Sequence, residues 1–597
     1  MAADLQNEPD QTLPNWNLND LYEGQDDPGL EEDLAWASAS STDFAKDVQG
    51  RLADLSGAEL GDAIARYETI LDRLYKVMSY AQLVHAGDMG SPEIAAFYQT
   101  LNERVTDITS ASLFFGLEIN RIDDDVLETQ LKDPKAARFE PWIRDVRVHR
   151  PHQLADDMEK LLHEKSVSGR AAWARLFDET MADLRFNVSD QQKTLGETLN
   201  LLSDPDSEVR KSGAKALAGG LQAHVRTLSL ITNTLSKDKE IEDNWRGYAG
   251  PVSGRNLANQ VEDEVVEALV SAVKDNYVDL AHRYYALKAE WFGQNKLDYW
   301  DRNAPLPDAD NRKIGWTEAR ETVLGAYSAF DPEMANIAAR FFDESWIDAP
   351  PRPGKNSGAF AHPTVSSAHP YVLVNFHGKT RDVMTLAHEL GHGVHQVLAA
   401  PQGTLMANTP LTLAETASVF GEMLTFQAML KSESDPVRRR VMLAGKVEDM
   451  MNTVVRQIAF HEFERQVHSE RPGGELSADR LGDIWMQTQT ESLGPALRFD
   501  DDYRVFWGYI PHFIHSPFYV YAYAFGDCLV NSLYDVFADG HPGFQVKYFD
   551  MLKAGGSKRH KELLAPFGLD ASDPEFWKRG LSVVSRFIDQ LEELDRQ

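Results

Sequence analysis

The stretch "DVMTLAHELGHGVHQVLAA" (382–400) decides how this chain is interpreted, because it combines a helical rhythm with the pattern His-Glu-x-x-His. Residues four apart lie on one face of an α-helix, so His388 and His392 can direct their imidazoles at one metal ion. Glu389 is rotated from His388 by about a quarter turn. From there it can reach a water molecule beside the ion and act as a general base. The stretch therefore predicts a helix that carries two ligands of a catalytic metal site.

His395 lies on the same predicted face, seven residues after His388. Catalytic zinc sites usually take two helical histidines and a third ligand from a separate element, which leaves one position open for water. We therefore expect His395 to be a packed or supporting histidine. The metzincin extension is absent, since the chain has His395 and Leu398 where that motif needs Gly and His. The similar stretch "HEFER" (461–465) ends in Arg and predicts an ordinary helix face.

The third ligand is expected in "NTPLTLAETASVFGEMLTFQAML" (408–430), whose pattern predicts a single helix. Glu415 and Glu422 share one face of it but lie about 10 Å apart along the axis, so only one can reach the ion. Small residues around Glu415 would allow a close approach to the first helix, which favours Glu415 and leaves Glu422 as the alternative ligand. Glu422 and Asp382 are candidates for orienting the histidine ligands through hydrogen bonds.

The surrounding pattern predicts a mainly α protein with a small sheet next to the metal helix. Apolar residues recur at helical spacing over 31–290 and again after 381, whereas 349–380 is clearly non-helical. Within it, 369–378 ("HPYVLVNFHG") predicts an edge strand that could bind an extended peptide through main-chain hydrogen bonds. A break near 203 divides the predicted N-terminal helical domain, 1–202, from the predicted catalytic domain, 203–597.

Composition restricts the partners of the chain and its cellular compartment. The 597 residues include 93 acidic and 60 basic side chains, a net charge of −33, which argues against nucleic acid and anionic membranes as partners. The single Cys528 excludes an intramolecular disulfide and fits a reducing compartment; its apolar surroundings predict a buried thiol. The acidic first residues do not resemble a secretory signal. No apolar run reaches the ~20 residues that span a membrane, so a cytoplasmic location is expected.

Three motifs together resemble the thimet oligopeptidase and oligoendopeptidase F family of zinc metallopeptidases, and most closely its bacterial oligoendopeptidase F branch. They are "DVMTLAHELGHGVHQ", "LAETASVFGEML" and "IPHFIHSPFYVYAYAFG". "NWNLNDLYEG" near the start is also similar to that branch, as is "GAFAHP…YVLVNFHGK". The resemblance implies one Zn²⁺ per chain, bound by His388, His392 and Glu415. It also implies two largely helical halves that flank a deep channel for short peptides.

The segment "YIPHFIHSPFYVYAYAFGD" (509–527) is rich in His and Tyr, whose N–H and O–H groups can stabilise the oxyanion formed when a peptide bond is attacked. The resemblance implies a His followed by a Tyr cluster in this role, and His512 matches the His. Tyr519 and Tyr523 are four apart and share a face. We favour Tyr523 over Tyr519, because matching the family's Tyr pairs requires a one-residue shift. A purely structural aromatic stripe is the alternative for the Tyr residues, and Tyr521 is expected to pack.

These observations predict a zinc-dependent oligoendopeptidase that hydrolyses short peptides through a metal-activated water, with Glu389 as general base. Two other functions are considered. A metallocarboxypeptidase on a similar scaffold would need a cationic group for the terminal carboxylate of its substrate. A peptide-binding protein with structural zinc would have no need of Glu389, whose presence argues against it. Cobalt and manganese are alternatives to zinc, because the donor set alone does not select among these ions.

Overall fold

The computed structural model describes residues 13–306 and 312–596. These residues are helical over most of their length, and their strands form only three small sheets, as the sequence predicts. The chain forms two compact units whose segments alternate along the sequence. Unit 1 contains Met1–Arg150, Asn311–Ser432 and Gly540–Phe567, and unit 2 contains Pro151–Asp310, Glu433–Asp539 and Gly568–Gln597. Residues 202 and 203 both fall in unit 2, and the predicted domain division between them stays a prediction.

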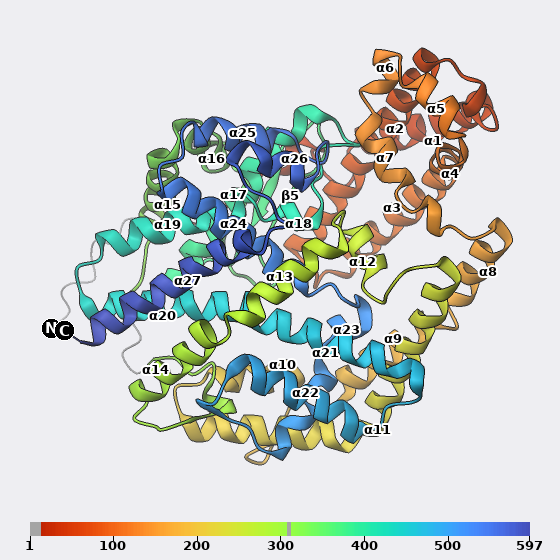
Figure 1. The fold of residues 1–597 in the computed structure, drawn as a ribbon. Helices are drawn as coiled ribbons and strands as arrows, with labels where there is room; N and C mark the ends of the chain where they lie inside the picture. The colour runs from red at the N-terminus through yellow and green to blue at the C-terminus, as the bar shows by residue number, and fades with distance from the viewer. Residues whose placement is uncertain (1–12, 307–311, 597) are drawn as a thin grey trace. The chain divides into compact units, whose positions relative to one another are not determined.

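Unit 1 contains the His-Glu-x-x-His helix, α17, and the elements packed around it (Figure 1). Many of its helices begin with a side-chain cap; Ser56 and Glu59, for example, form a reciprocal capping box at the start of α2. Its helices and strands are α1 (Pro28–Val48), α2 (Gly57–Gly87), α3 (Pro92–Ser110), α4 (Leu113–Arg121), α5 (Asp124–Gln130), α6 (Pro134–Ala137), α7 (Glu140–Arg147), α15 (Trp316–Phe330), α16 (Pro332–Asp343), β4 (Ile347–Asp348), β5 (Phe360–His362), β6 (Tyr371–Leu373), α17 (Thr380–Ala399), α18 (Leu411–Ala414), α19 (Ser418–Ser432), α25 (Phe544–Lys553) and α26 (His560–Leu564).

Unit 2 is built on α11, a helix of 40 residues whose apolar face enters a core shared with α21, α22 and the segment 501–509. Buried leucines recur on that face at Leu217, Leu221 and Leu228, the spacing of an amphipathic helix. Its helices and strands are α8 (Asp156–Ser166), α9 (Arg170–Asp183), β1 (Phe186–Val188), β2 (Gln191–Lys193), α10 (Leu195–Asn200), α11 (Ser207–Arg246), α12 (Ser253–Ala258), α13 (Asp263–Asp275), α14 (Arg283–Trp291), β3 (Leu297–Asp298), α20 (Pro436–Met450), α21 (Arg456–Glu470), α22 (Ala478–Leu493), β7 (Leu497–Arg498), α23 (His512–His515), α24 (Tyr521–Ala538) and α27 (Pro574–Asp595).

The sheet beside α17 differs from the prediction in its strand order. The order is β4-β6-β5, so β6, which lies within the segment predicted as an edge strand, is central. Val372 donates its N–H to Trp346 on the β4 side at 2.9 Å, while Tyr371 and Leu373 face β5 in the antiparallel pair. The edge-strand prediction for 369–378 was therefore wrong. Both β5 and β6 contact α17.

Two further local predictions were wrong. The single helix predicted over 408–430 is broken into α18 and α19, and Glu415 lies in the break. The helical interpretation of 31–290 missed the β1–β2 hairpin, whose turn residues Ser189 and Asp190 have φ values of 45° and 66°. Two consecutive residues with positive φ match the turn of a two-residue hairpin, and a Ser-Asp pair is a weaker signal for it than Asn-Gly.

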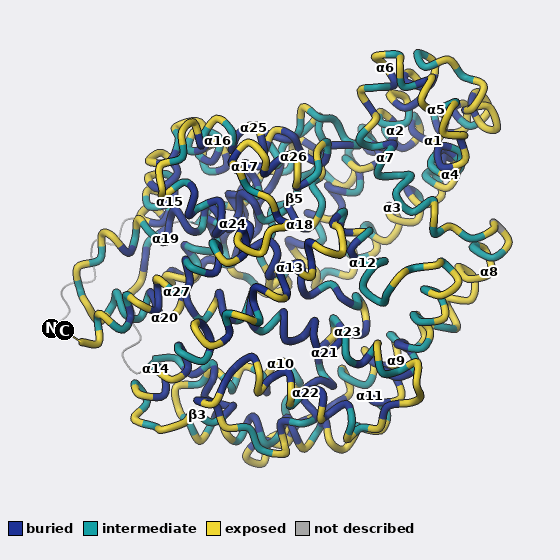
Figure 2. Tube along the Cα trace, viewed as in Figure 1, coloured by how far each residue is buried: buried dark blue, intermediate teal, exposed yellow. Residues whose placement is uncertain are grey.

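The apolar helix α24 is buried on nearly every face (Figure 2). Cys528 lies in it with 1% of its surface exposed, as predicted, and burial raises the pKa of its thiol well above the usual value. Although α24 is the most apolar long segment near the C-terminus, neither it nor any other helix among the described residues is long and apolar enough to cross a membrane.

Candidate metal centre and catalytic residues

Two glycines allow α17 to approach its neighbours closely. A Cβ at Gly391 would lie 2.6 Å from Ser418 Cα, and one at Gly393 would lie 2.7 Å from Phe341 Cε1, so neither position has room for a side chain. α17 therefore packs directly on the start of α19 on one side and on α16 on another (Figure 1). This close approach brings the chain before α19 to the face of α17 that carries the histidines.

His388, His392 and Glu415 form a cluster whose ligand atoms all lie within 4.8 Å of one another. Glu415 Oε2 is 3.3 Å from His388 Nε2 and 3.5 Å from His392 Nε2. A tetrahedral zinc ion with ligand bonds of about 2.0–2.2 Å would separate its ligand atoms by about 3.4 Å. The two imidazoles stand nearly perpendicular, at 82°, with their centroids 4.9 Å apart. The side chains thus fit a metal ion, and two nitrogens with one carboxylate oxygen is a donor set that zinc accepts.

The break between α18 and α19 orients Glu415. Thr416 Oγ1 donates to Leu413 O at 2.7 Å, which satisfies a carbonyl at the end of α18. Ser418 Oγ donates to Glu415 Oε2, also at 2.7 Å, and fixes the carboxylate. Burial raises the pKa of Glu415, but the hydrogen bond to His388 and the nearby His392 outweigh it and lower the pKa to about 2. Ser418 was not singled out in the sequence; its position three residues after Glu415 was the available signal.

Glu422 lies on the other side of His388. Its Oε2 accepts from His388 Nδ1 at 3.2 Å, so the ring is held with Nε2 toward Glu415. This contact is the one expected for a carboxylate that orients a histidine ligand. Asp382, the other candidate for that role, instead accepts the backbone N–H groups of His377 and Lys379 at 2.8 and 2.9 Å. Asp382 therefore caps the start of α17, and its predicted contact with the ligands was wrong.

Glu389 is 6% exposed and lies in a protein environment that disfavours its charge. Burial raises the pKa of its carboxyl to about 7, although a hydrogen bond from the Ala361 backbone in β5 acts in the opposite direction. Gln396, about two turns after Glu389 on α17, donates to Ala361 O at 3.1 Å. The two contacts fasten β5 to α17. This role of Ala361 could not be predicted, because the register of so short a strand depends on its neighbours.

His395 is buried inside unit 1, and burial lowers its pKa to about 4. Among the residues that the structure describes, the metal-binding cluster contains His388 and His392 but not His395. It is thus a neutral histidine packed behind the cluster, in agreement with the expectation.

In unit 2, the structure brings His512, Tyr519 and Tyr523 together. His512 Nε2 lies 3.2 Å from the hydroxyl oxygen of Tyr523, and the Tyr519 and Tyr523 rings are 5.3 Å apart. Tyr523 has 37% of its surface exposed, so it is not a core residue. Tyr521 points elsewhere: it is fully buried, and its hydroxyl accepts from Asn259 at 2.8 Å. The catalytic roles of His512, Tyr523 and Tyr519 stay predictions.

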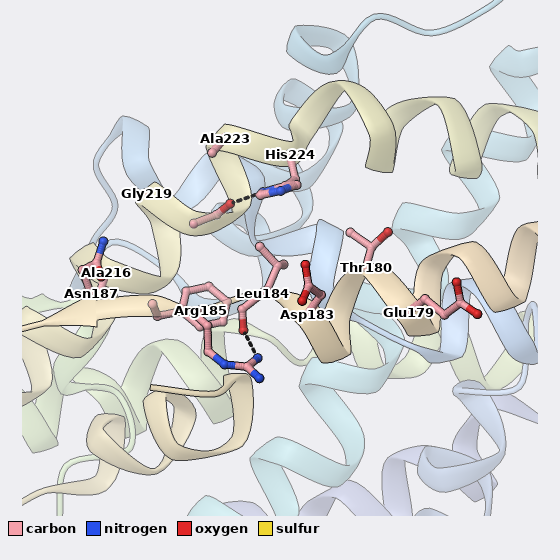
Figure 3. Close-up of a pocket in the computed structure, with 12 residues that line it drawn as sticks. Glu179, Thr180, Asp183, Leu184, Arg185, Asn187, Ala216, Gly219, Ala223 and His224 are labelled. Atoms are coloured by element: carbon pink, nitrogen blue, oxygen red, sulfur yellow. Dashed lines mark hydrogen bonds between the residues drawn. The ribbon is translucent and has the colours of Figure 1, made fainter. Parts of the chain in front are cut away.

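Unit 2 also has an open cavity of about 760 Å³ at the end of α9, beside β1 and α11 (Figure 3). Glu179, Asp183 and His224 are among its lining residues, but His224 Nδ1 bonds to Gly220 O of its own helix at 3.1 Å. Arg185 bonds to the carbonyl of Leu184. The lining contains none of the predicted site residues, and we assign it no chemistry.

Comparison with known sequences decides the family. Residues 200–583 match the sequence profile of Peptidase family M3, and residues 118–186 match that of Oligopeptidase F. The chain belongs to peptidase family M3. This M3 peptidase is 26% identical to Oligopeptidase PepF of Bacillus subtilis over 593 residues, which cover 97% of this chain and 87% of that one. It is 24% identical to an oligoendopeptidase F homolog of Lactococcus lactis, with 97% of both chains covered.

Solved structures share the fold of this M3 peptidase. A Chlamydophila abortus crystal structure matches with a TM-score of 0.87 and 22% identity, covering 97% of this chain and 98% of that one. Oligoendopeptidase-F from Enterococcus faecium matches with a TM-score of 0.70 and 24% identity, covering 95% and 98%. Membership of the family makes the protein a peptide-bond hydrolase of the metallopeptidase class.

Proposed function

We propose that this M3 peptidase is a zinc-dependent oligoendopeptidase that cleaves internal bonds of short peptides. The observation that carries the proposal is the spacing of His388, His392 and Glu415, which matches the ligand separations of a tetrahedral ion. A zinc ion bound there would act as a Lewis acid and lower the pKa of an attacking water. Glu422 supports this set, since its contact with His388 Nδ1 holds the ring for binding through Nε2.

Glu389 acts as the general base in this proposal. It follows His388 on the helix and is buried, so its carboxylate is screened from bulk solvent. The Ala361 N–H restrains one side of the carboxylate and leaves the other for the attacking water. Glu389 accepts a proton from that water as it adds to the scissile carbonyl, and then gives the proton to the leaving amine.

His512 and Tyr523 donate to the oxyanion in this proposal, with Tyr519 as the second candidate phenol. A His N–H and a Tyr O–H aimed at the developing negative charge each stabilise the transition state more than the substrate. The contact of His512 with Tyr523 supports their acting as a pair. We assign catalysis to residues 203–597, with 1–202 as an N-terminal helical domain. The single cysteine and the acidic surface support a cytoplasmic enzyme that acts on peptides rather than on nucleic acids or membranes.

The test uses zinc-loaded protein and an eight-residue peptide blocked at both ends. We expect internal cleavage, detected by mass spectrometry, and a fall in kcat of at least about 10³-fold in Glu389→Gln with an unchanged zinc content. Full activity of metal-loaded Glu389→Gln would remove Glu389 from the mechanism. Cleavage only of peptides with a free carboxyl terminus would indicate a carboxypeptidase. If no peptide is cleaved, the zinc site has no catalytic role.

A further inference from the structure

The stretch "HEFER" (461–465), expected to be an ordinary helix face, lies in α21, where its first four residues are buried. Glu464 is the notable member, because it is a carboxylate with only 2% of its surface exposed. Its Oε2 has no hydrogen-bond partner among the residues that the structure describes. Burial raises the pKa of Glu464 to about 8, with Lys239 and Arg255 as the nearby cations that oppose the rise. A buried acid that is not part of an ion pair is expensive to keep, which suggests a specific role.

The other oxygen of Glu464 makes one hydrogen bond, to the backbone of the loop between α23 and α24. Its Oε1 accepts the N–H of Phe518 at 2.8 Å. Phe518 is fully buried and has a φ of +60°, in the left-handed region that non-glycine residues avoid. Such a conformation costs about 1–3 kcal/mol and persists only where the surroundings enforce it. The Glu464 carboxyl is in the position to enforce it, because it satisfies the N–H that this conformation directs into the core.

The chain is also fastened on the N-terminal side of Phe518. Arg255 donates to Pro517 O at 3.2 Å, and Arg170 donates to His515 O at 3.0 Å. The Phe518 ring packs 4.8 Å from that of His468 on α21. These contacts hold a short connection of five residues, 516–520, between two helices.

The geometry of this connection sets the arrangement of the candidate oxyanion donors. His512 belongs to α23, before the loop, whereas Tyr519 lies in the loop and Tyr523 in α24. The strained turn at Phe518 returns the chain so that the His512 and Tyr519 rings stack with centroids 6.0 Å apart. The same return places the Tyr523 hydroxyl 3.2 Å from His512 Nε2.

We propose that Glu464 is a positioning residue for peptide hydrolysis. It holds Phe518 in its left-handed conformation and thereby keeps the Tyr523 hydroxyl beside His512 Nε2. The inference rests on the proposed oxyanion role of His512 and Tyr523. The hydrogen bond of Glu464 goes to the Phe518 backbone and not to either ring, and in this proposal Glu464 neither gives nor takes a proton in the reaction. Its contribution is the acceptor oxygen for the Phe518 N–H.

The test compares three variants by steady-state kinetics on the blocked peptide. Glu464→Met keeps the approximate volume but removes the acceptor, so we expect kcat to fall about 10- to 100-fold while KM stays within about 3-fold. Glu464→Gln retains a carbonyl oxygen for the Phe518 N–H and should keep kcat within about 3-fold of the wild type. Glu462→Met is the matched control: Glu462 is 4% exposed on the same helix but pairs with Lys274 and Arg465, not with the loop. It should lower Tm without lowering kcat.

A second measurement combines Glu464→Met with Tyr523→Phe. If Glu464 acts through the pair, the double variant has a kcat close to that of Tyr523→Phe alone. An unchanged kcat in folded Glu464→Met, or losses that multiply in the double variant, would overturn the role of Glu464 and leave the proposed function intact. Unchanged kcat in both Tyr523→Phe and His512→Ala would instead refute the oxyanion assignment, and the positioning role with it.

Discussion

At the scale of single residues, three carboxylates near α17 differ in role because they differ in partner. Glu415 faces both histidine Nε2 atoms, Glu422 faces only the Nδ1 of His388, and Glu389 faces a backbone N–H. The sequence pattern predicted helical positions for all three and favoured Glu415 over Glu422 as the ligand, but Glu415 lies outside the helices, in the break between α18 and α19. The break before α19 brings the Glu415 carboxylate close to the Nε2 atoms of both histidines.

Removing Glu415 should release the metal. In Glu415→Ala, two histidines remain, and a site with two ligands binds zinc far more weakly than one with three. We expect metal analysis to show near-complete loss of zinc at a chelator concentration that leaves the wild type fully loaded. Glu422→Ala is the comparison: it should lose about 10- to 100-fold in zinc affinity but reload when zinc is in excess. The opposite ranking of the two variants would make Glu422 the ligand.

The neutral state of His461 should make the protein less stable in acid. Burial lowers the pKa of this residue to about 4, below its usual 6.5. Above pH 6.5 both folded and unfolded chains carry it neutral; as the pH falls from 6.5 toward 4, only the unfolded chain binds the proton. The resulting loss in free energy of unfolding between pH 7 and pH 5 is about 2 kcal/mol.

His461→Phe provides the measurement, because it removes the titrating group and keeps an aromatic ring near Phe518 and Tyr521. Urea unfolding of both proteins at pH 7 and pH 5 should show a smaller loss in the variant. His224→Phe is the control, since that histidine is exposed on α11. An equal loss in wild type and His461→Phe would mean that His461 is charged in the folded state.

At the scale of elements, the sequence pattern predicted helices and strands that depend on local spacing. It did not predict features that depend on packing between segments distant in the chain. The helix carrying His388 and the strand at 371–373 follow from spacing and composition alone. The position of β6 between β4 and β5 does not, because strand order is fixed by long-range pairing. The break at Glu415 escaped prediction for the same reason: its residues favour a continuous helix, and packing against Gly391 overrides that preference.

The close packing of α17 on α19 gives a prediction at this scale. In Gly391→Ala, the new Cβ would meet backbone atoms of Ala417 and Ser418, which cannot move without displacing Glu415. We expect a loss of about 2–3 kcal/mol in stability and a reduced affinity for zinc. Gly325→Ala in α15 is the matched control, because its Cβ meets nothing within 4 Å and should stabilise the helix by about 0.5–1 kcal/mol. Equal melting temperatures and equal zinc affinities for the two variants would contradict the packing argument.

At the scale of the whole molecule, the division into two units and the net charge both involve residues spread along the entire chain. Each compact unit collects three separate segments, so the folding of either unit needs residues that are far apart along the chain. The metal ligands lie in unit 1 and the His512 cluster in unit 2. The 33 excess negative charges set the average field that a peptide meets as it approaches.

That field should make catalysis depend on the charge of the substrate and on salt. A surface with a net charge of −33 attracts cationic peptides and repels anionic ones, and dissolved salt screens both effects. For a peptide with two added lysines, we expect kcat/KM to fall about 10-fold as NaCl rises from about 10 to 200 mM. For the matching peptide with two added aspartates, kcat/KM should rise as NaCl increases over the same range. An uncharged peptide serves as the control. A common salt response of all three peptides would show that the acidic surface does not guide substrates to the site.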